Sequence, residues 1–143
     1  MSVRRAVSYP LLALILAACT AAPIPESDPS EVESVVASFY EGIGAADYPG
    51  MEALTTPDFE IVDGGLRMDF PEFRDFLADV FAQGVELDFA LDRLHTVVQG
   101  DVAYTTLRAV NQPLDRAFHE TVILRRIDGV WLVDRFHSTP VRE

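Results

Sequence analysis

The sequence predicts an α+β domain in which helices come first and a strongly curved antiparallel sheet follows. Apolar side chains recur every three or four residues in two segments between residues 30 and 84, which is the spacing of amphipathic helices. From Leu87 onward the period changes to two, and turn-forming residues divide this part of the chain into four strands. Helices followed by a run of strands are typical of the α+β class.

The N-terminus has the pattern of an export signal. Arg4 and Arg5 precede an apolar run at residues 11–17. This run is shorter than the ~20 residues that a membrane-spanning helix needs. We therefore expect residues 1–18 to be a signal peptide.

The segment Leu16-Ala17-Ala18-Cys19 resembles the lipobox of bacterial lipoprotein precursors. The resemblance implies cleavage before Cys19, lipidation of its thiol and a membrane anchor in the cell envelope. Thr20 after the cysteine implies the periplasmic leaflet of the outer membrane if the cell is Gram-negative. An ordinary signal peptidase site, with Cys19 incidental, is the alternative.

We expect residues 19–29 to be a proline-bearing lipidated tether and residues 30–143 to fit one domain. Cys19 is the only cysteine, so an intrachain disulfide is impossible. The formal net charge of −12 disfavours binding to nucleic acid or to anionic head groups. Motifs of nucleotide binding and of serine hydrolysis are not seen in the sequence.

Ser30 is expected to cap the first helix, with Glu33 in the capping-box position, and the apolar stripe of this helix is expected to run to Ile43. A weaker helical turn at residues 49–54 precedes a strand at 59–63. Gly64-Gly65 then forms a turn into a short strand at 66–68.

The second long helix is expected to begin at the cap Asp69, with Glu72 as its capping-box partner, and to stop at Gly84. In the following strand the alternation slips near Arg93, which predicts a bulge that curves the sheet. Further strands are expected at 102–111, 116–126 and 130–138, the last two joined by a hairpin at Asp128-Gly129.

Three segments carry a family resemblance: Gly100-Asp101-Val102-Ala103, residues 125–131 and Phe136-His137-Ser138. With the order of the elements, they resemble the SnoaL-like, nuclear transport factor 2-like superfamily. Residues 68–73 and 120–138 are also similar to the association domain of calcium/calmodulin-dependent protein kinase II. The resemblance implies a cone in which a curved sheet wraps around helices and encloses a pocket.

Because alternate residues of a strand share one face, the resemblance also implies which side chains line that pocket. The inward set is expected to be Val102, Tyr104, Thr106 and Arg108; Phe118, Glu120, Val122 and Leu124; and Leu132, Asp134, Phe136 and Ser138.

Four polar residues of this set are candidate pocket or catalytic groups: Tyr104, Arg108, Glu120 and Asp134. Two carboxylates in an apolar pocket can act as an acid and a base, as in the epoxide-hydrolase and ketosteroid-isomerase branches. A structural ion-pair network is the alternative. With the opposite strand phase, Arg135 and His137 would replace Asp134 in the pocket.

The histidines at 95, 119 and 137 lack metal-ligand spacing, so we expect no metal and no cofactor. His119 and His137 are expected on the outer face with Trp131, Val133 and Arg135. In this superfamily such a face implies packing against a second copy, and we expect a homodimer.

Three functions follow as hypotheses. The first is an envelope-anchored domain that binds a small hydrophobic or weakly polar molecule without catalysis. The second is an isomerase, cyclase or hydrolase that uses pocket carboxylates, and the third is a dimerisation module.

Overall fold

The computed structural model describes residues 28–142. The export signal, Cys19 and the tether up to residue 27 lie outside the described residues. The elements, in chain order, are α1 (Pro29–Ala45), α2 (Tyr48–Ala53), β1 (Thr55–Asp63), β2 (Leu66–Met68), α3 (Phe70–Ala82), β3 (Phe89–Gln99), β4 (Val102–Asn111), β5 (Arg116–Ile127) and β6 (Val130–Pro140).

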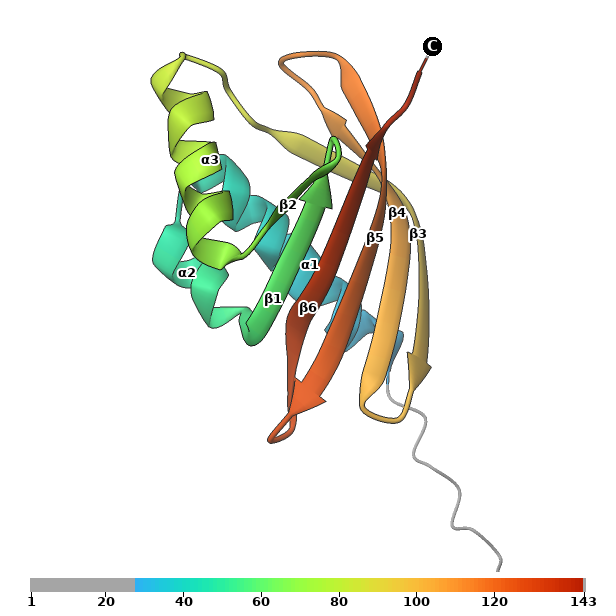
Figure 1. The fold of residues 1–143 in the computed structure, drawn as a ribbon. Coiled ribbons are helices and arrows are strands. Elements are labelled where there is room, and N and C mark those ends of the chain that lie inside the picture. Colours follow the sequence, from blue (N-terminus) through green and yellow to red (C-terminus); the bar gives the residue numbers. More distant parts are fainter. Residues whose placement is uncertain (1–27, 143) are drawn as a thin grey trace, which may run out of the picture.

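The six strands form one sheet in the order β2-β1-β6-β5-β4-β3. Strands β3 to β6 are an antiparallel meander, and β1 pairs with β6 in parallel, which makes the sheet mixed. Figure 1 shows the long strands standing side by side, with α2 and α3 on the other side of β1 and α1 running behind the sheet. The predicted α+β fold with a curved sheet is confirmed.

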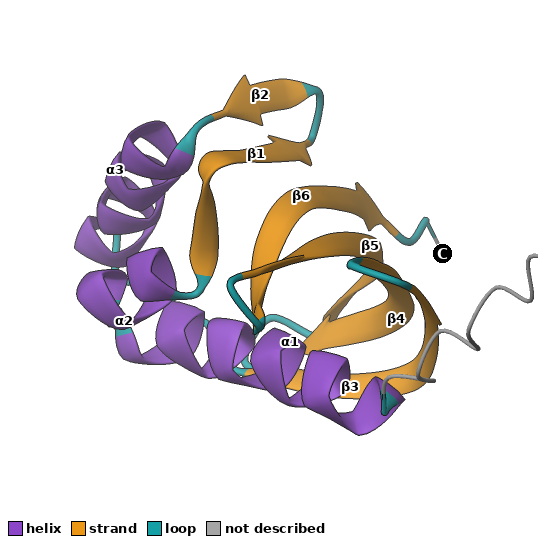
Figure 2. Cartoon of the chain, turned by 90° about the horizontal axis from the view of Figure 1, so that it is seen from below, coloured by secondary structure: helices purple, strands orange, loops and turns teal. Residues whose placement is uncertain are grey.

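Seen along the strands, the sheet curls into an open cone (Figure 2). Helix α1 lies across the concave side of this curl, and α3 lies beside β1 and β2. Within residues 28–142, none of the helices is both long and apolar enough to cross a membrane.

Two bulges account for much of this curvature. In β3 the register shifts between Asp92 and His95, and Arg93 has φ of 55°. In β6, Val133 pairs with Leu124 and Arg135 pairs with Ile123, so Asp134 is an extra residue between them. An extra residue bends its strand and increases the local twist. The predicted bulge near Arg93 is confirmed, and the one at Asp134 was not predicted.

The ends of the helices follow the capping rules, with one correction. The N-cap of α1 is Asp28, whose carboxylate accepts a hydrogen bond from the Ser30 amide, so Ser30 is not the cap. Glu33 instead accepts a hydrogen bond of 2.9 Å from the Thr96 hydroxyl of β3. In α3 the predicted capping box of Asp69 and Glu72 is present in both directions.

The core lies between α1, α3 and the concave face of the sheet. Phe39 of α1 contacts three phenylalanine rings, those of Phe59, Phe73 and Phe136, at centroid distances of 5.9 to 6.4 Å. Tilted ring pairs at such distances contribute ~0.5–1.5 kcal/mol beyond burial of their area. This cluster fixes α1 against the sheet and forms the inner end of the cone's cavity.

Candidate functional site

A small pocket opens at one end of the cone, where β1 ends, β3 begins and the β4–β5 connection passes. Its volume is about 130 Å³. An apolar cavity of ~150 Å³ holds a molecule the size of benzene. Most of its wall is apolar: Ile43, Ile61, Phe73, Phe76, Leu77, Leu87, Phe89, Leu114, Phe118 and Phe136.

Three polar side chains form a row across the inner wall of this pocket. In the register of the sheet, Asp63 of β1 lies beside Ser138 of β6, and Ser138 lies beside Glu120 of β5. The Ser138 hydroxyl donates a hydrogen bond to Glu120 Oε1 at 3.3 Å. The row is produced by the pairing of three strands that are far apart in the sequence.

Tyr40 of α1 also lines the pocket. Its side chain is buried, and so is that of Glu120, which is 5% exposed. Among the described residues, neither Tyr40 Oη nor Glu120 Oε2 has a hydrogen-bond partner. Buried polar atoms are almost always hydrogen-bonded, so two unpartnered ones in the same pocket are an unusual feature that a bound molecule would explain.

The environment of Glu120 favours its neutral form. Burial raises the pKa of Glu120 to about 8; the nearby charge of Asp63 adds to the rise, and the hydroxyl groups of Ser138 and Tyr40 oppose it. The Tyr40 hydroxyl therefore influences the titration of Glu120 although the two side chains are not hydrogen-bonded to each other. At pH 7 Glu120 is therefore mainly a protonated carboxyl group that can donate a hydrogen bond.

The other two ionisable groups shift in the same direction. Burial, followed by the charge of Glu120, raises the pKa of Tyr40 well above 10. Burial also raises the pKa of Asp63, although the nearby Ser138 hydroxyl and the Gly64 amide oppose the change. The pocket therefore offers two donors, on Tyr40 and Glu120, beside a carboxyl group whose ionised form is disfavoured.

Of the four predicted polar candidates, only Glu120 lines this pocket. The inward phase expected for β4 is wrong, because the buried residues of that strand are Ala103, Thr105, Leu107, Ala109 and Asn111. Tyr104 is therefore on the outer face and 41% exposed. Arg108 also points outward and forms an ion pair of 2.9 Å with Asp92.

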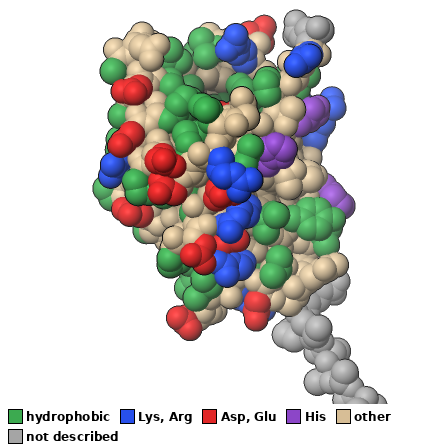
Figure 3. Space-filling view, in the orientation of Figure 1, with side chains coloured by type: hydrophobic (Ala, Val, Ile, Leu, Met, Phe, Trp, Pro, Cys, Tyr) green, Lys and Arg blue, Asp and Glu red, His purple; other side chains and the backbone are tan. Residues whose placement is uncertain are grey.

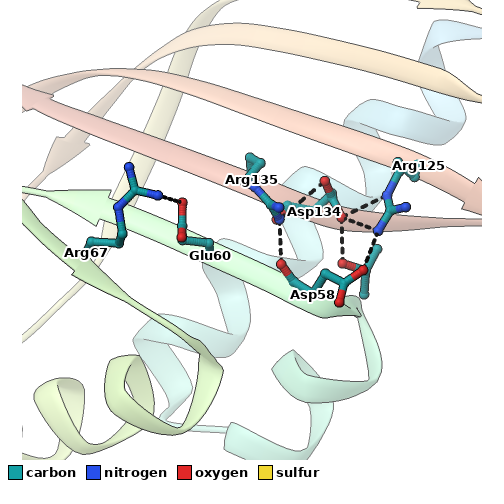
Figure 4. Close-up of polar contacts among 7 residues, drawn as sticks. Asp58, Glu60, Arg67, Arg125, Asp134 and Arg135 are labelled. Atoms are coloured by element: carbon teal, nitrogen blue, oxygen red, sulfur yellow. Dashed lines mark hydrogen bonds and ion pairs between the residues drawn. The ribbon is translucent and has the colours of Figure 1, made fainter.

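Asp134 lies on the outer side of the sheet as well. In Figure 4 it stands between two guanidinium groups. Its Oδ1 accepts hydrogen bonds from Thr56 Oγ1 at 2.7 Å and from Arg125 Nε at 2.8 Å. Arg135 is 3.4 Å from Asp134 Oδ2 and also donates to the backbone carbonyl of Asp58. The bulge explains the error, because the extra residue at Asp134 reverses the alternation of β6.

The polar cluster around Asp134 links strands β1, β5 and β6 and does not line the pocket. Thr56 and Asp58 belong to β1, Arg125 to β5, and Asp134 with Arg135 to β6. The expected phase holds for Phe136 and Ser138, which come after the bulge, and fails for Leu132 and Asp134. The alternative candidates Arg135 and His137 do not line the pocket either.

The prediction that Trp131 and Val133 lie on the outer face is also wrong. Trp131 is 4% exposed and Val133 is fully buried. The guanidinium group of Arg126 lies 5.1 Å from the centre of the Trp131 ring. A tryptophan held in this way is part of the interior and cannot meet a second copy of the chain.

Four polar residues of the pocket lining were missed in the sequence: Tyr40, Asp63, Asn111 and Arg116. Tyr40 belongs to the apolar stripe of the first helix, so its pattern indicated only core. Asp63 precedes the Gly64-Gly65 turn, where a carboxylate is unremarkable. The position of Asp63 at the end of a strand was the one usable signal. It could not be connected to Ser138, because alternation does not reveal the parallel pairing of β1 with β6.

The histidine side chains gather over the sheet in Figure 3. All three, at positions 95, 119 and 137, are exposed. In residues 28–142, His, Cys, Asp and Glu side chains do not form a group of three or more that could hold a metal ion.

The fold and the pocket define a cone-shaped α+β domain of the nuclear transport factor 2-like type. Residues 32–142 match the model of the SnoaL-like domain family. The chain therefore belongs to the SnoaL-like domain family. No curated protein matches the chain significantly.

Solved structures support the fold. A putative dehydratase of the NTF2-like family from Streptomyces avermitilis is 23% identical with a TM-score of 0.72, over 83% of this chain and 99% of its own. An NTF2-like protein from Cytophaga hutchinsonii is 13% identical with a TM-score of 0.70, over 80% and 99% of the two chains. A putative aromatic ring hydroxylase from Novosphingobium aromaticivorans is 16% identical with a TM-score of 0.66, over 81% and 90%. At these identities the likeness shows the fold.

Proposed function

We propose that this protein is an envelope-anchored lipoprotein whose SnoaL-like domain binds a small, largely apolar molecule without transforming it. The observation that supports binding most directly is the pair of unpartnered buried atoms, Tyr40 Oη and Glu120 Oε2, in an apolar pocket. A few polar groups in an otherwise apolar cavity are typical of small-molecule sites.

The protonation of the pocket indicates the chemistry of the ligand. With a pKa of about 8, Glu120 is mostly neutral at pH 7 and can donate to an acceptor. The Tyr40 hydroxyl can donate to the same atom. We therefore propose that the ligand presents a carbonyl or ether oxygen to this pair, with a ring or short chain against the phenylalanine side chains.

Native mass spectrometry of the protein, extracted in detergent from its own envelope, tests this proposal. We expect a co-purified small molecule on the wild type and its loss from Glu120→Leu, which removes the donor and keeps the bulk. Glu60→Gln, a substitution on the outer side of β1, is the control and should retain the ligand. Repeated ligand-free spectra of the wild type would contradict the proposal.

The lipid anchor rests on the sequence pattern that ends at Cys19. Helix α1 begins at the end of the domain that is far from the pocket, which is where a tether from Cys19 would join it. Glu33 near the start of α1 contacts Thr96 towards the β3–β4 hairpin, whereas Tyr40 and Ile43 line the pocket. We propose that the pocket opens away from the membrane that holds the anchor.

Globomycin treatment and the Cys19→Ala variant test the anchor. Globomycin should cause the unprocessed precursor to accumulate, and the variant should leave the membrane fraction after a carbonate wash or lose its acyl mass. Unchanged processing and membrane association in both experiments would refute the lipoprotein proposal.

Acid–base catalysis is the second candidate function, and the row of Asp63, Ser138 and Glu120 favours it. Ionised Asp63 would remove a proton from the carbon next to a ligand carbonyl. Glu120 and Tyr40 would hold the resulting oxyanion, and the proton would return to another carbon. Two carboxyl groups in different environments are suited to such divided roles.

Deuterium exchange distinguishes this enzyme from a binding protein. The co-purified molecule should gain mass in D₂O only when the protein is present, and Asp63→Asn should stop the exchange without releasing the molecule. A bound molecule that never exchanges would leave binding as the function.

We also propose that two copies associate through the outer face of the sheet. Val102 and Tyr104 on this face are 48% and 41% exposed. Tyr104 pairs across the strands with Val97 on one side and Ile123 on the other. This row, and not Trp131, is the apolar surface available to a second copy.

A further inference from the structure

We infer that Arg116 is an anion-binding group at the mouth of the pocket, and that the ligand is an amphipathic carboxylate. This inference rests on the proposed function, in which the pocket binds a small molecule, and it names the class of that molecule.

The pairing of the arginines singles out Arg116. Every arginine from Arg67 to Arg135 other than Arg116 forms an ion pair with a carboxylate. The side chain of Arg116 has no ion-pair or hydrogen-bond partner among the described residues. In a chain with 23 acidic and 11 basic residues, a guanidinium group left without a carboxylate is unexpected. Even Asp115, its neighbour in the chain, does not pair with it.

Arg116 lies at the pocket that contains Glu120. Arg116 and Glu120 line the same cavity and lie on the same strand, with Phe118 between them. Residues i, i+2 and i+4 of a strand share one face, and a strand rises ~3.3 Å per residue, so the two backbone positions are ~13 Å apart. A ring with a short chain spans such a distance once both side chains reach towards it.

The charges inside the pocket set the direction in which the ligand enters. Asp63 and Glu120 lie together in the row across β1, β6 and β5, and an anionic group there would meet carboxyl groups. At the mouth the same group would meet the guanidinium of Arg116, which can hold a carboxylate with two hydrogen bonds. The carboxylate is therefore at the mouth and the hydrogen-bond acceptor at Glu120, with the apolar body against Phe118.

Calorimetric titration of the full-length protein with a matched pair of probes tests the inference. The probes are 4-(4-acetylphenyl)butanoate and its neutral amide, which share a ring and an acetyl oxygen and differ in charge. At low salt we expect the carboxylate to bind the wild type about fivefold more tightly, which is the upper end for an ion pair with an exposed arginine such as Arg116. The preference should shrink at high salt.

Two variants assign the effect to Arg116. Arg116→Gln should abolish the preference, so that the acid and the amide bind equally well. Arg142→Gln, which removes a cation outside the pocket lining, should retain it. Equal binding of both probes to the wild type, or a preference that survives Arg116→Gln, would overturn the inference while leaving the pocket as a binding site. Failure of both probes to bind the wild type would overturn this ligand class, and a ligand-free native mass spectrum would separately count against the pocket.

Discussion

The Ser138 hydroxyl donates a hydrogen bond to Glu120 Oε1, while Glu120 Oε2 has no partner among the described residues. One oxygen of the carboxyl group is thus fixed by the neighbouring strand, and the other is buried without a partner on a side chain that lines the pocket. This arrangement holds the Glu120 side chain in place and leaves Oε2 available for a hydrogen bond with a ligand. The first two predictions concern this group and the tyrosine near it.

The stability of the protein should fall as the pH rises from about 4.5 to about 8. Below this range Glu120 is protonated in both the folded and the unfolded chain. Above its ordinary pKa of 4.5 the unfolded chain loses the proton, but the folded chain keeps it up to about 8, so folding is progressively disfavoured. Asp63, whose pKa is also raised, acts in the same direction.

Urea unfolding at pH 5 and pH 8.5 measures this effect. Glu120→Gln should remove most of the loss, which we expect to be ~2–4 kcal/mol in the wild type. Glu41→Gln, an exposed position on α1, should unfold with the same pH dependence as the wild type. If the free energy of unfolding changes with pH by the same amount in the wild type and in Glu120→Gln, the pKa of Glu120 is not raised.

Tyr40→Phe should leave the ligand-free protein as stable as the wild type, or make it up to ~1 kcal/mol more stable. The substitution removes a buried hydroxyl group that has no partner among the described residues, so it removes a cost of burial without breaking a hydrogen bond. Binding of the acetyl probe should weaken about tenfold. Calorimetry and thermal unfolding of the same sample measure both effects, and a strongly destabilised variant would mean that the hydroxyl is bonded.

Asp134→Ala should destabilise the protein by ~1–3 kcal/mol and leave pocket binding unchanged. It would leave buried Thr56 without its partner, remove the carboxylate partner of Arg135 and leave Arg125 with only its 3.4 Å ion pair to Asp58. The two guanidinium groups are partly exposed, so water offsets some of this loss. Asp58→Asn, at the exposed edge of the cluster, should cost less than 1 kcal/mol. If folded Asp134→Ala no longer binds the ligand, Asp134 is a residue of the binding site and the prediction is wrong.

Arg93→Gly should stabilise the protein by ~0.5–1 kcal/mol. Arg93 has φ of 55° in the β3 bulge, where a side chain is strained and glycine is not. Arg93→Ala keeps the Cβ atom and should bring no such gain. Thermal unfolding compares the two variants, and equal midpoints would mean that the strain is relieved in another way.

Tyr104→Glu should convert the proposed dimer to a monomer, because it places a charge in the centre of the apolar row on the outer face. Light scattering coupled to size-exclusion chromatography measures the mass. Gln99→Glu, at the edge of the same face, serves as the control and should remain dimeric. A monomeric wild type would contradict the dimer proposal.

Much of the fold could be predicted because its signals are local. The alternation from Leu87 onward, the Asp128-Gly129 hairpin and the capping box at Asp69 each depend on neighbours in the sequence, and each is present in the structure. Even the bulge near Arg93 appeared as a slip in the alternation. Hydrophobic period and turn chemistry were sufficient to predict the order of the elements.

The candidate site was predicted less well, because its geometry depends on the register between distant strands. Glu120 was placed correctly on the inner face, but Tyr104 and Arg108 were assigned to the wrong side of β4. The inward phase of β4 came from the family resemblance, and the larger side chains of Val102 and Tyr104 agreed with it although Ala103 and Thr105 are the buried residues. On β6 a single extra residue at Asp134 reversed the alternation, and nothing in the local sequence marks it.

By itself, the sequence determined an α+β chain with an export-signal pattern ending at Cys19 and an acidic composition, because composition and short-range periodicity encode these properties, and its resemblance to a known family indicated the SnoaL-like type. Only the tertiary structure decided which polar groups meet. The parallel pairing of β1 with β6 brings Asp63 to Ser138 and Glu120, and the packing of α1 brings Tyr40 to the same pocket. These contacts depend on strand register and helix packing, which a one-dimensional pattern does not specify.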